Sequence, residues 1–356
     1  MAKLIILRDA KEKIEKLKSN EVLDFYYGFH NLKYSKNFDV LYLNRSKPNS
    51  LIKFILFPFE KFFSKMTTLG FHLDIIFENY KFLKKFELVF TPTDGLSFAV
   101  LFAKCLRIFD FKSVTLFQSL SERHNKFFYK NFIIKKFIKF LLSYSSKILV
   151  LSEKSKLELI KDFGINSNKI SVYRFGVDFK YWSIDKKKEL NFELPKEFIL
   201  SVGNDMNRDY QIFDKINVNL PIIIVSQKKI FNVSNVSILN NIENEDLKYL
   251  YHKAYCVVIP IKKLLSESSG LSTVLQSMSS KKVTIVSDND SLQEYFSDKK
   301  DVLFYEAENA NSLQERIDQI IKNKELKKHI EINAQKTILE KYNLNNMEEQ
   351  LIKFIN

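Results

Sequence analysis

Two successive rounds of apolar segments alternating with helical patterns constrain this chain more than any other feature of its sequence. In the first half, short runs such as Lys3 to Leu7, Leu88 to Thr91 and Ser113 to Phe117 are separated by stretches with a helical pattern, such as Glu21 to Leu32. The alternation starts again at Phe198 and continues to Asn323; it includes a predicted helix from Tyr210 to Ile216 and predicted strands from Val236 to Leu239 and from Cys256 to Ile259. Strands that alternate with helices form parallel sheets with crossover helices. The sequence therefore predicts an α/β fold with two doubly wound domains.

The two predicted domains are similar in size. A chain of 356 residues is too long for one ordinary hydrophobic core, and 46% hydrophobic residues allow two cores. We place the junction in Phe179 to Lys196, which is dense in charged and turn-forming residues. The first domain then covers residues 1–182, the second covers 183–340, and a closing helical segment over 341–356 could cross back to the first domain. Ligands of such sheets lie beyond the carboxyl ends of the strands, so two facing domains would share one cleft.

Composition argues against several classes of protein. The longest apolar stretches, such as Phe132 to Leu142, are broken by lysines and fall short of the roughly 20 residues needed to cross a bilayer. Met1 to Asp9 lacks the apolar core and cleavage site of a signal peptide, so we expect a cytoplasmic protein. Cys105 and Cys256 are the two cysteines of the chain and lie far apart in it, so neither a disulfide framework nor a thiolate metal site is predicted.

The net charge of +14 points to two classes of partner, nucleic acid and anionic membranes. Leu51 to Lys65 and Lys126 to Lys147 alternate Phe, Ile or Leu with Lys at near-helical spacing. Such helices can lie on an anionic bilayer, but the same pattern is typical of helices that pack an apolar stripe on a sheet. Both interpretations stay open. The aromatic residues form no recognisable stacking platform for bases, so we do not expect nucleic acid as a partner.

The segment from Ser266 to Met278 has the features of an anion site. It joins small residues to the start of an apolar helix, and the first amides of that helix, from about Gly270 onward, have free N–H groups. Small residues also let a ligand approach the backbone. The alternative is a plain helix cap by Ser269 or Ser272.

A second candidate is the segment from Ser201 to Tyr210. It is a strand that ends in a glycine turn, with Arg208 at the start of the next helix. A guanidinium there could hold two phosphate oxygens at once. The alternative is an ion pair of Arg208 with Asp205 or Asp209 on the surface, which would contribute little to stability.

The order of these segments resembles the retaining glycosyltransferases of family 4. The resemblance covers residues 148 to 340 well and the first 110 residues poorly. It rests on an ordered set: Ser152 after a strand, Arg174-Phe175-Gly176-Val177-Asp178, Ser201-Val202-Gly203 with Arg208, Glu267 to Met278, and Lys282 to Asp288. It implies the GT-B architecture, in which two Rossmann-like domains face each other across a cleft, and a nucleotide-diphosphate sugar as donor.

The resemblance also implies the residues of the donor site. In the family a basic pair binds the diphosphate; Asn204 stands at the first basic position, and Arg208 matches the second. Two acids eight residues apart are usual around the small-residue loop, but this chain has Ser268 and Gln276 there, with Glu267 one step earlier. Gln276 can still accept a hydrogen bond from the ribose. We expect Arg208 and Glu267 to be catalytic, and donor binding to involve Gly203, Asn204, Arg208, Ser268, Ser269, Gly270, Leu271, Ser272, Thr273 and Gln276.

The first half offers four candidates for the acceptor side of the cleft. The family often has a His after the strand that matches Ser113 to Phe117, where this chain has Gln118 and Ser119. Gln118 could donate to a sugar hydroxyl. Asp94 follows another strand and could line the cleft or cap a helix. His124 is the fourth candidate, although a surface position at a helix start is the simpler interpretation.

Other chemistries find little support in the sequence. It contains no Walker-type loop, zinc-ligand spacing, serine elbow or G-x-G-x-x-G after the first strand. We expect neither a metal nor a cofactor beyond the sugar nucleotide. The resulting hypothesis is retaining transfer of a hexose-type sugar to a cell-envelope or lipid-linked glycan at the inner face of the membrane. The alternatives are a catalytically weakened protein of the same fold that binds a nucleotide sugar or glycan, and, on charge alone, a nucleic-acid-binding protein.

Overall fold

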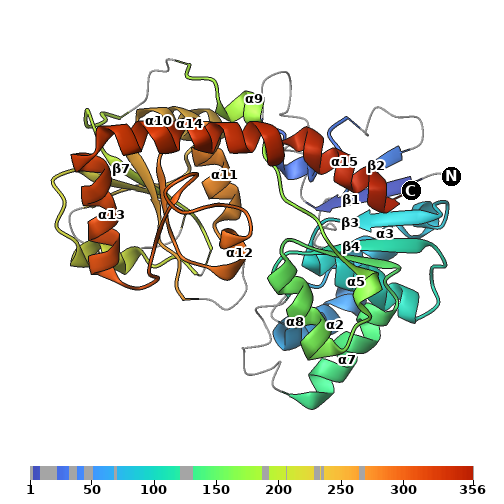
Figure 1. Ribbon diagram of the computed structural model, residues 1–356. Helices are drawn as coiled ribbons and strands as arrows, with labels where there is room; N and C mark the ends of the chain where they lie inside the picture. Colours follow the sequence, from blue (N-terminus) through green and yellow to red (C-terminus); the bar gives the residue numbers. More distant parts are fainter. Residues whose placement is uncertain are drawn as a thin grey trace. The chain divides into compact units, whose positions relative to one another are not determined.

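The chain forms two compact units (Figure 1). The computed structural model describes residues 3–8, 22–31, 38–43, 51–67, 70–120, 131–186, 192–205, 207–227, 233, 236–263 and 269–355. Unit 1 consists of Met1–Ser19, Tyr26–Arg174 and Met347–Asn356. Unit 2 consists of Asn20–Phe25 and Phe175–Asn346. The prediction that two such domains face each other across a cleft stays a prediction.

Unit 1 is built on a six-stranded parallel sheet in the order β2-β1-β3-β4-β5-β6. The direction in which strands are added reverses between β1 and β3, and such a switch point is where doubly wound folds bind ligands. The sequence predicts most of these strands correctly, because their buried faces are continuous apolar runs. Their bounds are β1 Lys3–Arg8, β2 Phe38–Leu43, β3 Leu88–Thr91, β4 Lys112–Phe117, β5 Lys147–Val150 and β6 Ile170–Val172.

The helices of unit 1 form a layer on the sheet, with α5, α7 and α8 along one side of it (Figure 1). Their inner faces share one apolar core with the sheet, in which Phe71, Phe98 and Phe117 are buried. The bounds are α2 Leu51–Thr67, α3 Leu73–Glu78, α4 Tyr80–Leu83, α5 Asp94–Cys105, α7 Phe132–Ser143 and α8 Glu153–Phe163, with a 3-10 helix at Ser167–Lys169. Within the described residues, no helix has the length and apolar character needed to cross a membrane.

Unit 2 is built on a second six-stranded parallel sheet in the order β12-β11-β10-β7-β8-β9. Counted within the unit, this is the strand order of the Rossmann fold, and its switch point lies between β7 and β10. The core contains Ile224, Val258 and Ile285, all fully buried. The strands are β7 Ile199–Val202, β8 Ile222–Val225, β9 Val236–Leu239, β10 Cys256–Ile259, β11 Thr284–Ser287 and β12 Leu303–Tyr305.

The helices of unit 2 follow the predicted alternation. Helix α11 packs against β10, β11, α9 and α14, whereas α13 packs against β11 and β12. The predicted helix from Tyr210 to Ile216 is a 3-10 helix, Tyr210–Lys215. The bounds are α9 Phe179–Trp182, α10 Asn244–Lys253, α11 Leu271–Ser279, α12 Asp290–Gln293, α13 Ala310–Lys322 and α14 Lys324–Lys341. Helix α15, Leu344–Ile355, begins in unit 2, and its residues from Met347 onward belong to unit 1.

The chain changes units earlier than the sequence predicts. The predicted first domain ends at residue 182, but Phe175 already belongs to unit 2. The reason lies in hydrogen bonds within unit 2: Val177 N donates to Tyr342 O at 3.0 Å, and Trp182 Nε1 donates to Asp24 Oδ2 at 2.8 Å. At the other end of the chain, residues from Met347 onward are grouped with unit 1.

A helix predicted from Glu21 to Leu32 is wrong for the described part of that segment. Residues 22–31 contain only a 3-10 helix, Asp24–Tyr26. Asp24 is buried and accepts hydrogen bonds from three groups of unit 2, so its short segment is held by partners that are distant in sequence. Tertiary contacts of this kind override a local helical pattern.

Candidate functional site

The loops after β7 and β10 meet at the switch point of the second sheet. Their backbones are joined by hydrogen bonds from Asp209 N to Pro260 O at 3.0 Å and from Lys262 N to Asn207 O at 2.8 Å. Arg208 forms an isolated antiparallel bridge with Ile261 between these two bonds. The pairing therefore fixes Arg208 at the place where a doubly wound sheet binds its ligand.

The guanidinium of Arg208 is buried, with 3% of its side chain exposed. Its Nη2 donates to Thr273 Oγ1 at 3.2 Å, and its Nε lies 2.9 Å from Asp205 Oδ2, although the N–H is not directed at that oxygen as a hydrogen bond requires. Its Nη1 has no hydrogen-bond partner among the described residues. The predicted pair with Asp205 thus forms, but the prediction of a surface pair is wrong. Buried donors without partners are rare and mark a place where a ligand can bind.

Two glycines make room for this guanidinium. A Cβ atom at Gly203 would lie 2.0 Å from Arg208 Nε, and one at Gly270 would lie 2.8 Å from Arg208 Nη1. Gly270 also has a φ of +78°, which side chains other than glycine rarely adopt. The two loops that the sequence singles out therefore converge on one side chain within unit 2.

Helix α11 begins directly after Gly270. The first amides of a helix have no partner in the helix, so those of Leu271, Ser272 and Thr273 are available to an anion beside Arg208. The side chain of Leu271 is buried, so only its backbone is available to a ligand. Ser269 Oγ donates to Asp205 Oδ1 at 3.0 Å, which ties the end of the loop to the Arg208 pair. Two other predicted site residues, Glu267 and Ser268, lie outside the described residues.

Asn204 and Gln276 are both engaged with other parts of unit 2. Asn204 Oδ1 accepts hydrogen bonds from Gln227 N at 2.7 Å and Ser226 Oγ at 3.3 Å, so it holds the loop that follows β8. Gln276 Nε2 donates to Asp24 Oδ2 at 3.0 Å and to Ser272 Oγ at 3.3 Å. The predicted roles of both residues in donor binding stay predictions.

Sequence reasoning missed the cluster around Asp24. Asp24 Oδ1 accepts from Asp178 N at 2.5 Å, and Oδ2 accepts from Trp182 Nε1 and Gln276 Nε2. Burial raises the pKa of Asp24 to about 6, while the hydrogen bonds from Asp178 N, Gln276 and Trp182 lower it and the nearby carboxylate of Asp178 adds a smaller upward effect. Asp178 also caps α9 by accepting from Tyr181 N at 3.0 Å.

In unit 1, three of the four predicted acceptor-side residues come together. Asp94 is the first residue of α5, close to the switch point, and its carboxylate accepts from Gln118 N at 2.6 Å and from Ser119 N at 3.1 Å and Oγ at 2.9 Å. Gln118 Nε2 donates to Pro92 O at 2.8 Å. The carboxylate therefore holds the loop after β4 against the start of α5. His124 lies outside the described residues.

Replacing Asp94 with alanine is expected to destabilise unit 1 by about 2–3 kcal/mol, because three donors of Gln118 and Ser119 then lose a charged acceptor. Urea unfolding followed by far-ultraviolet circular dichroism measures the change. Asp110→Ala is the matched control, since Asp110 is an exposed carboxylate on the same unit. An equal loss in both variants would contradict the role of Asp94 in holding the loop.

Comparisons with known proteins bear on the fold and on part of unit 2. Residues 226–337 match the model of a family described as glycosyl transferases group 1. No curated protein matches the chain by sequence. Sucrose-phosphate synthase from Thermosynechococcus elongatus has a similar structure, with a TM-score of 0.74 and 14% identity over 99% of this chain and 98% of that one.

Two further solved structures agree. The HepE protein of Anabaena, in complex with UDP and glucose, has a TM-score of 0.67 and 12% identity over 99% of both chains. A glycosyltransferase from Rickettsia africae has a TM-score of 0.63 and 15% identity over 99% of this chain and 97% of that one. The chain therefore has the α/β fold of two Rossmann-like units that is called GT-B, and its second unit contains a region similar to the glycosyl transferases group 1.

Proposed function

We propose that this chain is a glycosyltransferase that takes a sugar from a nucleoside-diphosphate donor bound to unit 2. The observation that carries the proposal is the buried Arg208 guanidinium, whose Nη1 has no partner among the described residues, at the switch point of the second sheet. A diphosphate would supply the missing acceptor. The match of residues 226–337 to the glycosyl transferases group 1 and the structural similarity to HepE in complex with UDP and glucose support this choice of ligand.

The proposed chemistry is charge stabilisation of the departing diphosphate. When the bond from the anomeric carbon to the leaving phosphate breaks, negative charge develops on the diphosphate oxygens. Arg208 and the free amides at the start of α11 are fixed beside one another before the reaction, so they stabilise that charge without having to reorganise. We further propose retention at the anomeric carbon, with the leaving phosphate helping to take the acceptor proton. Glu267 stays the proposed second catalytic residue.

The proposed acceptor is a cell-envelope or lipid-linked glycan. Asp94, Gln118 and Ser119 form an ordered polar cluster close to the switch point of unit 1, where such folds bind ligands. Gln118 and Ser119 are half-buried, so part of each is accessible to a sugar hydroxyl. This arrangement supports unit 1 as the acceptor side.

A second candidate function is binding of a nucleotide sugar without catalysis. The observation in its favour is that Asn204 and Gln276 both bond to other parts of the protein. Release of free sugar from the cognate donor separates the two functions, because a binding protein would be stabilised by the donor without cleaving it.

Binding of UDP, GDP or ADP tests the donor site directly. One of the three, at about 100 times its Kd, is expected to stabilise the protein by about 2.7 kcal/mol, because it binds only the folded state. Thermal unfolding followed by the fluorescence of Trp182, the only tryptophan in the chain, measures the shift in unit 2. The matching nucleoside monophosphate, which lacks the second phosphate, is expected to give a smaller shift. Absence of any shift with all three diphosphates would overturn the proposal.

A further inference from the structure

Helix α2 of unit 1 exposes an apolar stripe to solvent. Its inner side packs on the core through Phe63, whose ring stacks on Phe71 at 5.0 Å and on Phe137 of α7 at 5.2 Å. Its outer side is also apolar, with spacings of three and four residues that place the members on one face. The exposed fractions are Leu51 74%, Phe54 81%, Ile55 56% and Phe62 62%, and Pro58 is exposed between them.

The charges that accompany this stripe are cationic. Lys61 and Lys65 are exposed on α2, whereas its one carboxylate is turned into the protein. That carboxylate, Glu60, accepts a hydrogen bond from Asp74 N at 2.7 Å, and burial raises the pKa of Glu60 to about 7. The exposed face of α2 thus combines apolar side chains with positive charge only.

Helix α7 continues the same pattern beside α2. Phe132 and Ile133 at its start are 67% and 74% exposed, and Lys136 Nζ lies 4.3 Å from the centre of the Phe132 ring. The α7 sequence contains three lysines and no acidic residue. Two neighbouring helices therefore present exposed aromatic and aliphatic side chains together with lysines.

A groove adjoins α2, and a basic pocket adjoins the groove. The groove has a volume of about 610 Å³ and is lined by Ile55 and Leu56 of α2 and by Tyr80, Lys84 and Arg107, with no carboxylate among the described lining residues. The pocket has a volume of about 830 Å³ and shares Lys84, Arg107 and Ile108 with the groove.

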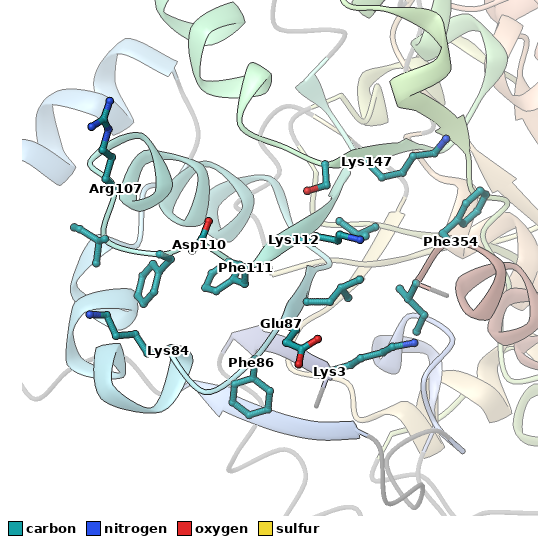
Figure 2. Close-up of a pocket in the computed structure, with 16 residues that line it drawn as sticks. Lys3, Lys84, Phe86, Glu87, Arg107, Asp110, Phe111, Lys112, Lys147 and Phe354 are labelled. Carbon is teal, nitrogen blue, oxygen red and sulfur yellow. The ribbon is translucent and has the colours of Figure 1, made fainter. Parts of the chain in front are cut away.

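The pocket lies at the amino ends of the first sheet. Five cationic residues line it, against the two carboxylates of Glu87 and Asp110. Figure 2 shows Arg107 and Lys84 at one end of it and Lys3, Lys147 and Phe354 toward the other. Lys84 and Arg107 thus lie at the boundary between the apolar groove beside α2 and the basic pocket.

An anionic bilayer fits this surface better than a second copy of the chain. A symmetric pair that met through the α2 stripe would bring Lys61 and Lys65 of both copies together, and like charges repel. Anionic headgroups instead complement the lysines while the apolar stripe leaves water, which is the pattern of helices that lie in a membrane interface. The net charge of +14 acts in the same direction.

We propose that unit 1 docks on the surface of an anionic bilayer, with the α2 stripe immersed at the interface and Lys84 and Arg107 bound to lipid phosphate groups. The inference goes beyond the proposed donor site and does not depend on it, since all the residues that carry it belong to unit 1.

Co-sedimentation with vesicles tests the proposal. The protein is expected to bind vesicles of phosphatidylcholine mixed with phosphatidylglycerol, to bind phosphatidylcholine alone much more weakly, and to dissociate as salt is raised. The double variant Phe54→Ser/Phe62→Ser is expected to lower the partition coefficient by at least roughly tenfold, because two large apolar side chains no longer leave water. Lys84→Gln/Arg107→Gln is expected to lower it by roughly twenty-five-fold, since each cation near an anionic surface contributes about fivefold.

Ile332→Ser/Leu339→Ser is the matched control, because these residues of α14 in unit 2 are 47% and 56% exposed. It is expected to bind vesicles like the wild type. All the variants change exposed side chains, so their melting temperatures, and the shifts in melting temperature that a nucleotide causes, should equal those of the wild type. A failed nucleotide-binding test would therefore leave the membrane-docking proposal intact. No binding to anionic vesicles would overturn the proposal. Equal binding to neutral and anionic vesicles would also overturn it. If the protein binds no vesicles, two results would point to another occupant: a dimer that the substitution Phe54→Ser/Phe62→Ser dissociates, or binding of inorganic phosphate.

Discussion

Replacing Arg208 with alanine is expected to lower the rate of sugar transfer by roughly a hundredfold to a thousandfold, the range found when one preorganised donor to a developing negative charge is removed. The guanidinium is buried between Gly203 and Gly270, and Nη1 has no partner among the described residues. Its loss would remove a buried cation from this switch point. The thermal stabilisation by the cognate nucleoside diphosphate should disappear together with the activity.

Two further variants make this prediction specific. Arg208→Lys keeps the positive charge but loses the planar fork, so it is expected to recover part of the binding and only a small part of the rate. Arg316→Ala is the matched control, because Arg316 is another guanidinium of unit 2 that donates to Phe304 O at 2.7 Å and pairs with Asp298 at 3.3 Å. If Arg208→Ala and Arg316→Ala lower the rate of sugar transfer equally, the proposal that Arg208 stabilises the departing diphosphate is wrong.

The sequence predicts the sheets well because their strands are buried apolar runs. In unit 2 the predicted strands Val236 to Leu239 and Cys256 to Ile259 have the observed bounds, and the others differ by one residue at one end or at both. Glycines in the loops that follow the strands are also informative, since Gly203 and Gly270 both lie against Arg208. Strand order and the switch point follow from topology, so the convergence of two loops that lie far apart in the chain could be expected from pattern alone.

The surroundings of these side chains could not be predicted in the same way. The i,i+3 spacing of Asp205 and Arg208 indicates an ion pair but does not tell whether it is exposed, because burial depends on Thr273 and on the helix that follows Gly270. Likewise, nothing in the residues around Asp24 indicates that its carboxylate bonds to Trp182 and Gln276, which are far away in the chain. Patterns within a segment predict elements, whereas contacts between distant segments decide which polar groups remain for a ligand.

The buried Asp24 carboxyl is expected to make unit 2 less stable as the pH rises from about 4 to about 6. Its pKa is 3.8 as an ordinary carboxyl and about 6 in the folded protein, where burial outweighs the hydrogen bonds from Asp178 N, Trp182 and Gln276. The folded state therefore binds the proton more tightly than the unfolded state does. The resulting stabilisation, about 3 kcal/mol, is fully present below pH 3.8 and is lost as the pH rises through 6.

Asp24→Asn isolates this contribution because asparagine has nearly the same shape and does not ionise. We expect the free energy of unfolding of the variant, minus that of the wild type, to increase by about 3 kcal/mol between pH 4 and neutral pH, because only the wild type loses stability over this range. Urea unfolding followed by Trp182 fluorescence measures this free energy and reports on the surroundings of Asp24, since the indole N–H donates to Asp24 Oδ2. Asp318→Asn, a carboxylate of unit 2 on α13 that accepts from Gln314 Nε2 at 3.0 Å, serves as the control and should show no such gain. A difference between Asp24→Asn and wild type that stays constant with pH would show that the Asp24 carboxyl ionises normally in the folded protein and that its burial does not hold the proton.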